Sequence, residues 1–86
     1  MVTSAVVGPG SEPPRVGYAI GRGVGGAVVR NRVRRRLRAA TRAHAAELVP
    51  GHAYLVGAGP AASQRSYAEL SIALHDALSA LREETS

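Results

Sequence analysis

The chain has 86 residues, a net charge of +5 and no cysteine, phenylalanine or tryptophan. This length allows a single domain with a modest core, and the lack of cysteine excludes disulfides, thiolate zinc sites and a thiol nucleophile. A pI near 11.1 favours a polyanionic partner. No segment is apolar and long enough to span a membrane and no secretory leader is evident, so we expect a cytoplasmic protein without a membrane partner.

The first third of the sequence predicts two strands and a glycine-rich loop. Residues 1–7 (MVTSAVV) and 16–20 (VGYAI) are typical of strands, and residues 8–14 (GPGSEPP) of a turn. Residues 21–26 (GRGVGG) satisfy the G-x-G-x-x-G pattern of dinucleotide-binding turns. No acid follows on a next strand, and the chain is too short for a doubly wound sheet, so we expect no small-molecule cofactor. The loop amides and Arg22 still favour a phosphate.

The arginine-rich stretch that follows is the most informative part of the sequence. Residues 30–38 hold six arginines in nine positions, and the next acid is Glu47. A helix over residues 27–48 has one apolar arc, formed by Val29, Val33, Leu37, Ala40, His44 and Leu48. Like charges on the remaining surface destabilise a helix unless a polyanion neutralises them, and arginine binds phosphate oxygens in pairs. The pattern therefore indicates nucleic-acid binding. A merely solvated helix is the alternative, but it leaves the lack of acids unexplained.

The C-terminal half predicts one more strand and one more helix. Pro50 and Gly51 end the arginine helix, residues 52–58 form a strand, and residues 59–65 form a loop. The run Ser66-Tyr67-Ala68-Glu69 fits a capping box. It opens a helix whose apolar stripe consists of Leu70, Ala73, Leu74, Ala77, Leu78 and Leu81. The order of elements predicts an α/β fold: a small α/β sandwich with a short sheet and two main helices.

Catalytic and metal-binding residues are not evident in the sequence. None of His44, His52 and His75 is paired with a nucleophile by spacing, and His44 lies on the apolar arc of its helix. The acids are isolated except for a pair at residues 83–84, so no two-carboxylate metal pair is visible. We therefore expect no catalytic residue and no metal site within the protein itself.

Residues 15–38 (RVGYAIGRGVGGAVVRNRVRRRLR) resemble the signature of the bacterial ribonuclease P protein component. In that family a strand leads through a basic glycine turn into an Ala-Val-x-Arg-Asn-Arg helix. The resemblance implies one domain of this type over residues 1–86, without the family's N-terminal helix and part of its first strand. It also implies that the arginine helix crosses between strands with the left hand, whereas the general rule favours the right hand.

The same resemblance implies a function in tRNA 5′ maturation. The protein would be the RNA-binding subunit of ribonuclease P, an endoribonuclease whose RNA subunit carries the active site and its Mg²⁺ ions. Its partners would be that RNA and precursor tRNA. The residues expected to bind RNA are Arg22, Arg30, Asn31, Arg32, Arg34, Arg35, Arg38 and Arg42. Tyr18 is a candidate to stack on a leader base, with a half-buried strand tyrosine as the alternative.

Two other functions stay open at this point. One is a small structured-RNA-binding or ribosome-associated protein without a nuclease role. Only a ribonuclease P subunit should lower the Mg²⁺ concentration that a ribonuclease P RNA requires for activity. The other is a basic amphipathic module for anionic membranes, which is weaker because such helices carry bulky apolar residues and this one carries valine and alanine.

Overall fold

The computed structural model describes residues 2–7 and 12–85. The main elements in chain order are β1 (Val2–Val7), β2 (Arg15–Ile20), α1 (Ala27–Ala43), β3 (His52–Ala58) and α2 (Tyr67–Thr85). Three short 3₁₀ turns lie between them: η1 (Arg22–Val24), η2 (Ala45–Glu47) and η3 (Pro60–Gln64). The order of strands and helices confirms the predicted α/β class with two main helices.

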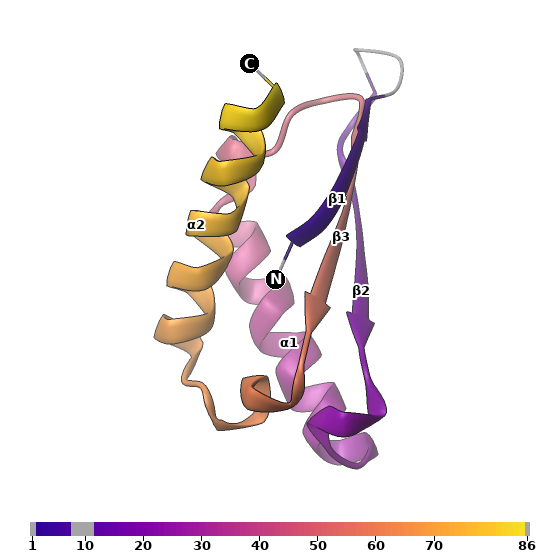
Figure 1. The fold of residues 1–86 in the computed structure, drawn as a ribbon, viewed down its shortest axis with the longest axis vertical. Coiled ribbons are helices and arrows are strands. Elements are labelled where there is room, and N and C mark those ends of the chain that lie inside the picture. The colour runs from indigo at the N-terminus through magenta and orange to yellow at the C-terminus, as the bar shows by residue number, and fades with distance from the viewer. Residues whose placement is uncertain (1, 8–11, 86) are drawn as a thin grey trace.

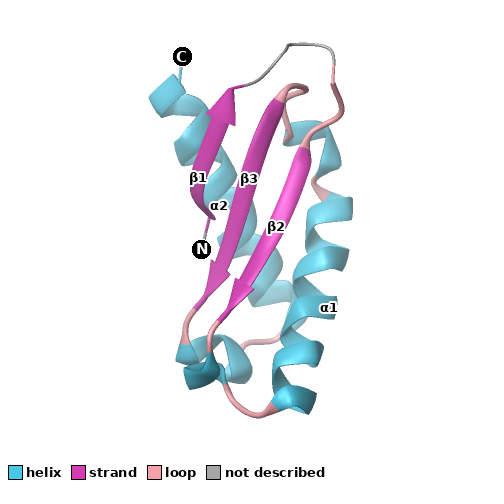
Figure 2. Cartoon of the chain, turned by 90° about the vertical axis from the view of Figure 1, so that its right-hand side faces the viewer, coloured by secondary structure: helices cyan, strands magenta, loops and turns pink. Residues whose placement is uncertain are grey.

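The three strands form one sheet in the order β1-β3-β2. β1 runs antiparallel to β3, with Val7 opposite His52, and β2 runs parallel to β3, with Val16 opposite Tyr54. Because parallel neighbours need a crossover connection, α1 spans from the end of β2 to the start of β3. Both helices lie on the same side of the sheet (Figure 1), and the sheet stands in front of them in Figure 2.

The core lies between the sheet and the two helices. Its largest fully buried side chains are Val33 and Leu37 of α1, Val56 of β3, and Leu70 and Leu74 of α2. These positions confirm the apolar stripes predicted for both helices from their 3.6-residue period. Among the described residues, neither helix combines the length and the apolar character that a membrane span requires.

The predicted end of the arginine helix at residue 48 is wrong. α1 ends at Ala43, because His44 leaves the helical conformation with φ −108° and ψ 22°. The chain then tightens into η2, a common way for a helix to satisfy its last carbonyl groups. Leu48 still packs against the core, but from an extended backbone position after the helix. Residues of the apolar arc continue at helical spacing past Ala43, so this spacing alone does not locate the end of the helix.

Two segments predicted as plain loops each contain a short 3₁₀ turn. η1 buries Val24 and η3 buries Ala62, and both side chains belong to the core. Between η1 and α1, Gly25 has φ +149°, a value that side-chain-bearing residues rarely adopt. A Cβ there would also lie 2.9 Å from Cβ of Val29. Local geometry therefore requires a glycine at residue 25, whatever the loop binds.

The capping box at the start of α2 is confirmed. The Glu69 amide donates to Oγ of Ser66 at 3.1 Å, and the Ser66 amide donates to Oε1 of Glu69 at 2.9 Å. These backbone and side-chain hydrogen bonds from Ser66 are the main reason that the pKa of the Glu69 carboxyl is lowered. The two residues fix where α2 begins, and thus where its apolar stripe meets the core.

Candidate nucleic-acid interface

The arginines of α1 cover the surface that the core leaves open. Arg32, Arg35, Arg38 and Arg42 are exposed, while Arg30, Arg34 and Arg36 are half-buried. Among the described residues, no ion pair joins an α1 arginine to a carboxylate. A hollow on this surface is lined by Val28, Asn31, Arg34, Arg35 and Arg38. We call these residues together with Arg30 the arginine face.

Contacts within the arginine face leave hydrogen-bonding capacity unused. Arg34 Nη1 donates to Oδ1 of Asn31 at 2.9 Å, so the amide turns this guanidinium along the helix. The Nε atom of Arg30 is buried and has no partner among the described atoms. A buried donor without a partner is costly, and an acceptor supplied by a ligand removes that cost. Val28, which is 80% exposed, lies in the same hollow.

Arg36 differs from the other arginines of the helix because it has an internal partner. Its Nη1 donates to the carbonyl oxygen of Arg65 at 2.8 Å. This bond joins α1 to the segment just before α2, so Arg36 contributes to the packing of the two helices. This difference between Arg36 and the other arginines agrees with the helical wheel, on which Arg36 lies beside the apolar arc rather than opposite it.

Tyr18 connects β2 to the arginine face. Its hydroxyl donates to Oγ1 of Thr41 at 3.2 Å, and the Thr41 hydroxyl donates to the carbonyl oxygen of Leu37 at 2.8 Å. The guanidinium carbon of Arg38 lies 5.9 Å from the centre of the Tyr18 ring, within the range of a cation–π contact. The ring of the half-buried tyrosine therefore packs against the guanidinium group of Arg38. Thr41 was not among the predicted residues, since a threonine in mid-helix gives no sign of its distant partner.

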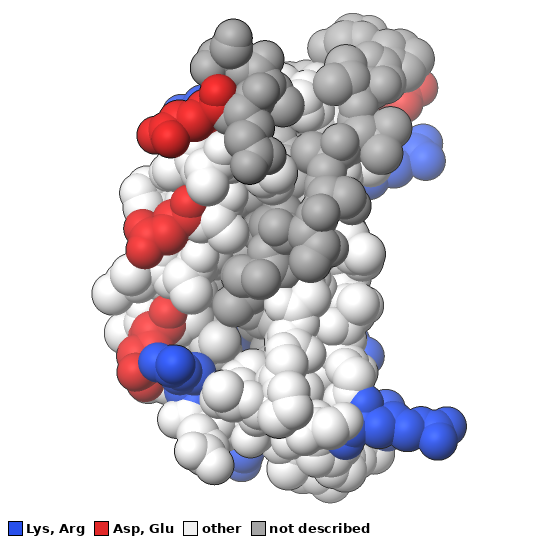
Figure 3. All heavy atoms as spheres, viewed as in Figure 1, with Lys and Arg blue, Asp and Glu red and all other residues white. Residues whose placement is uncertain are grey.

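The acids and most of the arginines lie on different helices. α1 contains seven arginines and no acid, whereas α2 carries Glu69, Asp76 and Glu83 among its described side chains. In Figure 3 most of the acidic residues in view lie along the side of the molecule that α2 occupies. A polyanion approaching the molecule is therefore attracted to α1 and repelled by α2.

The glycine turn extends the basic surface beyond the start of α1. Arg22 is exposed on η1, and Gly26 caps the helix without a side-chain hydrogen bond. The free amides at this end suit a phosphate group, and no acid occupies the first turn. The residues expected to bind RNA thus lie on η1 and α1, and most of them are exposed.

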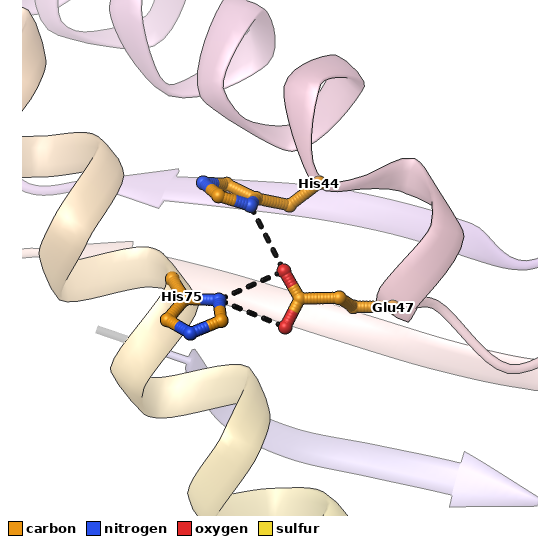
Figure 4. A group of neighbouring side chains, drawn as sticks. All are labelled: His44, Glu47 and His75. Atoms are coloured by element: carbon orange, nitrogen blue, oxygen red, sulfur yellow. Dashed lines mark hydrogen bonds and ion pairs between the residues drawn. The ribbon is translucent and has the colours of Figure 1, made fainter.

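A second group of polar side chains lies where η2 approaches α2, and the sequence analysis missed it. Nδ1 of His44 is 2.9 Å from Oε2 of Glu47, and Nδ1 of His75 is 2.9 Å from each oxygen of the same carboxylate. Arg82 Nη2 lies 3.2 Å from Oε1. Figure 4 shows both imidazole rings turned toward the carboxylate. The expectation that Glu47 is an isolated acid is therefore wrong.

The electrostatics of Glu47 reflect this crowding. Burial by itself raises the pKa of its carboxyl, but the hydrogen bond and charge of His75 oppose that effect. The charges of His44 and Arg82 act in the same direction, and the net result is a lowered pKa. The spacing of His44 and Glu47 by three residues was a visible signal. The approach of His75 and Arg82 depends on how α2 packs, which the spacing does not reveal.

Comparison with known proteins places the chain in a family. A family model described as Ribonuclease P matches residues 2–82. The chain belongs to the ribonuclease P protein family. It is 46% identical over 70 residues to the ribonuclease P protein component of Beutenbergia cavernae, an alignment that covers 81% of this chain and 59% of that protein. It is also 52% identical over 61 residues to the ribonuclease P protein component of a Nocardioides species, an alignment that covers 70% of this chain and 51% of that protein.

A solved structure of this family has the same fold. The ribonuclease P protein of Staphylococcus aureus matches with a TM-score of 0.78 at 19% sequence identity, covering 90% of this chain and 70% of that one. The chain spans between 49% and 62% of the length of the first curated relatives it matches. The family resemblance of residues 15–38 is thereby confirmed.

Proposed function

We propose that this chain is the RNA-binding protein subunit of ribonuclease P and assists a catalytic RNA in removing the 5′ leader from precursor tRNA. The observation that carries the proposal is the arginine face, a helix surface of guanidinium groups with no carboxylate partner among the described residues. Membership of the ribonuclease P family supports RNA as the polyanion that the arginine face binds. In this proposal the hydrolytic chemistry and its Mg²⁺ ions belong to the RNA subunit, and the protein works in the cytoplasm, where it meets precursor tRNA.

The docking surface for the RNA subunit is α1 with η1. Arg30, Asn31, Arg32, Arg34, Arg35 and Arg38 contact its phosphates, with Arg22 and Arg42 extending the contact at the two ends. Guanidinium groups form paired, charge-assisted hydrogen bonds to phosphate oxygens, and such contacts fix register and orientation. The acids of α2 keep the opposite side of the molecule away from the RNA.

The precursor leader passes near Tyr18 and Arg38 in this proposal. The tyrosine is half-buried and its hydroxyl donates to Thr41, so only part of its ring is open to a base. Arg38 lies over the ring, and its guanidinium plane is itself a surface on which a base can stack. The contact of Tyr18 with the leader stays a prediction.

We also infer that the crossover from β2 through α1 to β3 takes the left hand. Figure 2 supports this: with the helices behind the sheet, β2 runs downward on the right, α1 returns upward behind, and β3 runs downward on the left of β2. The right hand is the general rule for such units. In Figure 2 α1 lies on the side of the sheet where β2 forms the edge.

A structured-RNA-binding or ribosome-associated protein without a nuclease role is the alternative, because the arginine face would serve it equally well. Competition separates the two. Labelled ribonuclease P RNA of Beutenbergia cavernae is bound to the chain and displaced with unlabelled RNAs of equal length, followed by fluorescence anisotropy. We expect ribonuclease P RNA to compete at least about tenfold better than a ribosomal RNA fragment, because shape supplies part of RNA recognition. Equal competition by both RNAs would favour the alternative.

A further inference from the structure

We propose that His44, Glu47 and His75 form a binding site for a divalent transition-metal ion, with Zn²⁺ the ion that the ligands fit best. One nitrogen from each histidine and one oxygen of the glutamate lie within 4.8 Å of one another. The three side chains come from the end of α1, from η2 and from α2, so only the folded chain assembles them. This site lies apart from the arginine face and goes beyond the proposed function in RNA binding.

The chemistry of the three ligands selects the class of ion. Two imidazole nitrogens and one carboxylate oxygen are a known ligand set for Zn²⁺, which then keeps its fourth position for water. Mg²⁺ and Ca²⁺ prefer oxygen ligands throughout, so two imidazoles disfavour them. The ion would replace the contacts that now join Nδ1 of His44 and of His75 to Glu47. Small movements suffice, because those contacts already hold the ligand atoms close together.

Neighbouring groups already orient the three ligands. Nε2 of His44 lies 3.0 Å from Oγ of Ser71, and the serine oxygen can accept a hydrogen bond from the Nε2–H group while Nδ1 binds the ion. On the other side, Arg82 Nη2 contacts Oε1 of Glu47 and leaves Oε2 to face both histidines. Hydrogen-bonded outer partners of this kind are a regular feature of metal sites.

The site is open to solvent on one side, so an ion can reach the three ligands. A surface hollow lined by Glu47, His75, Ser79, Arg82 and Glu83 adjoins it. The Glu47 side chain is 18% exposed and that of His75 is 50% exposed, so solvent reaches the ligands. The positive charge of Arg82 opposes a cation, while the carboxylate of Glu83 at the rim favours one. A bound ion would join the end of α1 and η2 to the middle of α2.

The test titrates the tag-free 86-residue chain with Co²⁺ and, separately, measures its thermal unfolding with Zn²⁺ or Mg²⁺. We expect the strong visible absorption of four-coordinate Co²⁺, displaced by Zn²⁺, and a melting temperature that rises with Zn²⁺ concentration but not with Mg²⁺. Glu47→Gln and His75→Ala should each weaken Zn²⁺ binding more than ~100-fold. Ser71→Ala, which keeps all three ligands, should weaken it by about tenfold.

His52→Ala is the matched control, because it removes a histidine outside the cluster and should leave Zn²⁺ binding unchanged. Circular dichroism of each variant checks folding, and Ser71→Ala keeps the test valid if a ligand variant unfolds. The proposal fails if Co²⁺ gives only the weak absorption of a hexa-aqua-like ion. It also fails if His52→Ala weakens Zn²⁺ binding as much as His75→Ala does, because binding would then be unspecific.

Discussion

Replacing Arg30, Arg34 and Arg38 together with alanine is expected to weaken binding to structured RNA and to flatten its salt dependence by roughly two to three units on a log–log plot. Each guanidinium that neutralises a phosphate releases counterions, and one lost contact lowers the slope by about one unit. The measurement is the dissociation constant for ribonuclease P RNA over a series of salt concentrations. The variant should remain folded, because alanine favours helix and the change removes repulsion within α1.

A control variant with the same loss of charge makes the result specific. Arg15, Arg65 and Arg82 each lie close to a carboxylate, at Glu12, Glu69 and Glu47. Replacing these three with alanine lowers the net charge equally but spares the arginine face. We expect the salt slope of this control to stay near that of the unchanged chain. If both variants flatten the slope by the same amount, overall charge and not the arginine face determines RNA binding.

Leu37→Ala is expected to destabilise the fold by about 2–5 kcal/mol, the usual cost of removing a large aliphatic side chain from a packed core. Leu37 is fully buried and lies on the inner side of α1, directly behind the arginine face. A domain of this size has roughly 4–13 kcal/mol of stability in total, so the loss is a large fraction of it. The measurement is the midpoint and slope of urea denaturation, followed by circular dichroism.

Leu55→Ala is the matched control for that substitution. Leu55 is 40% exposed on the opposite face of the sheet from the helices, so its truncation removes much less buried area. We expect its effect on the free energy of unfolding to be less than half that of Leu37→Ala. Equal losses from the two substitutions would show that α1 is not docked by its apolar arc as described.

The fold was largely predictable because its main elements carry strong local patterns. The strand at residues 52–58 and the helix opened by Ser66 and Glu69 are where alternation and the capping box predict them. The end of α1 was not predictable from the helical period, because His44 and Leu48 continue the apolar arc while the backbone turns at His44. No glycine or proline marks that turn, which contacts α2 through His44 with Ser71 and Glu47 with His75.

The candidate site was predictable only where it is local in sequence. The arginine face could be predicted because its residues belong to one helix and recur with the helical period, and the structure places them on one side of α1. The special roles of Arg36 and Arg38 depend on Arg65 and Tyr18, which come from other elements. The cluster around Glu47 needs His75 and Arg82, 28 and 35 residues away. Such contacts follow from packing of helices, which residue spacing does not encode.

Cleavage of precursor tRNA by ribonuclease P RNA at limiting Mg²⁺ tests the central claim most directly. The RNA of Beutenbergia cavernae is assayed alone, with this chain, and with the variant that lacks Arg30, Arg34 and Arg38. If the chain is the protein subunit, it lowers the Mg²⁺ concentration needed for half-maximal cleavage at the correct 5′ site, and the variant does so much less. If the chain binds the RNA but leaves the Mg²⁺ requirement and the cleavage rate unchanged, it is not the ribonuclease P subunit that we propose.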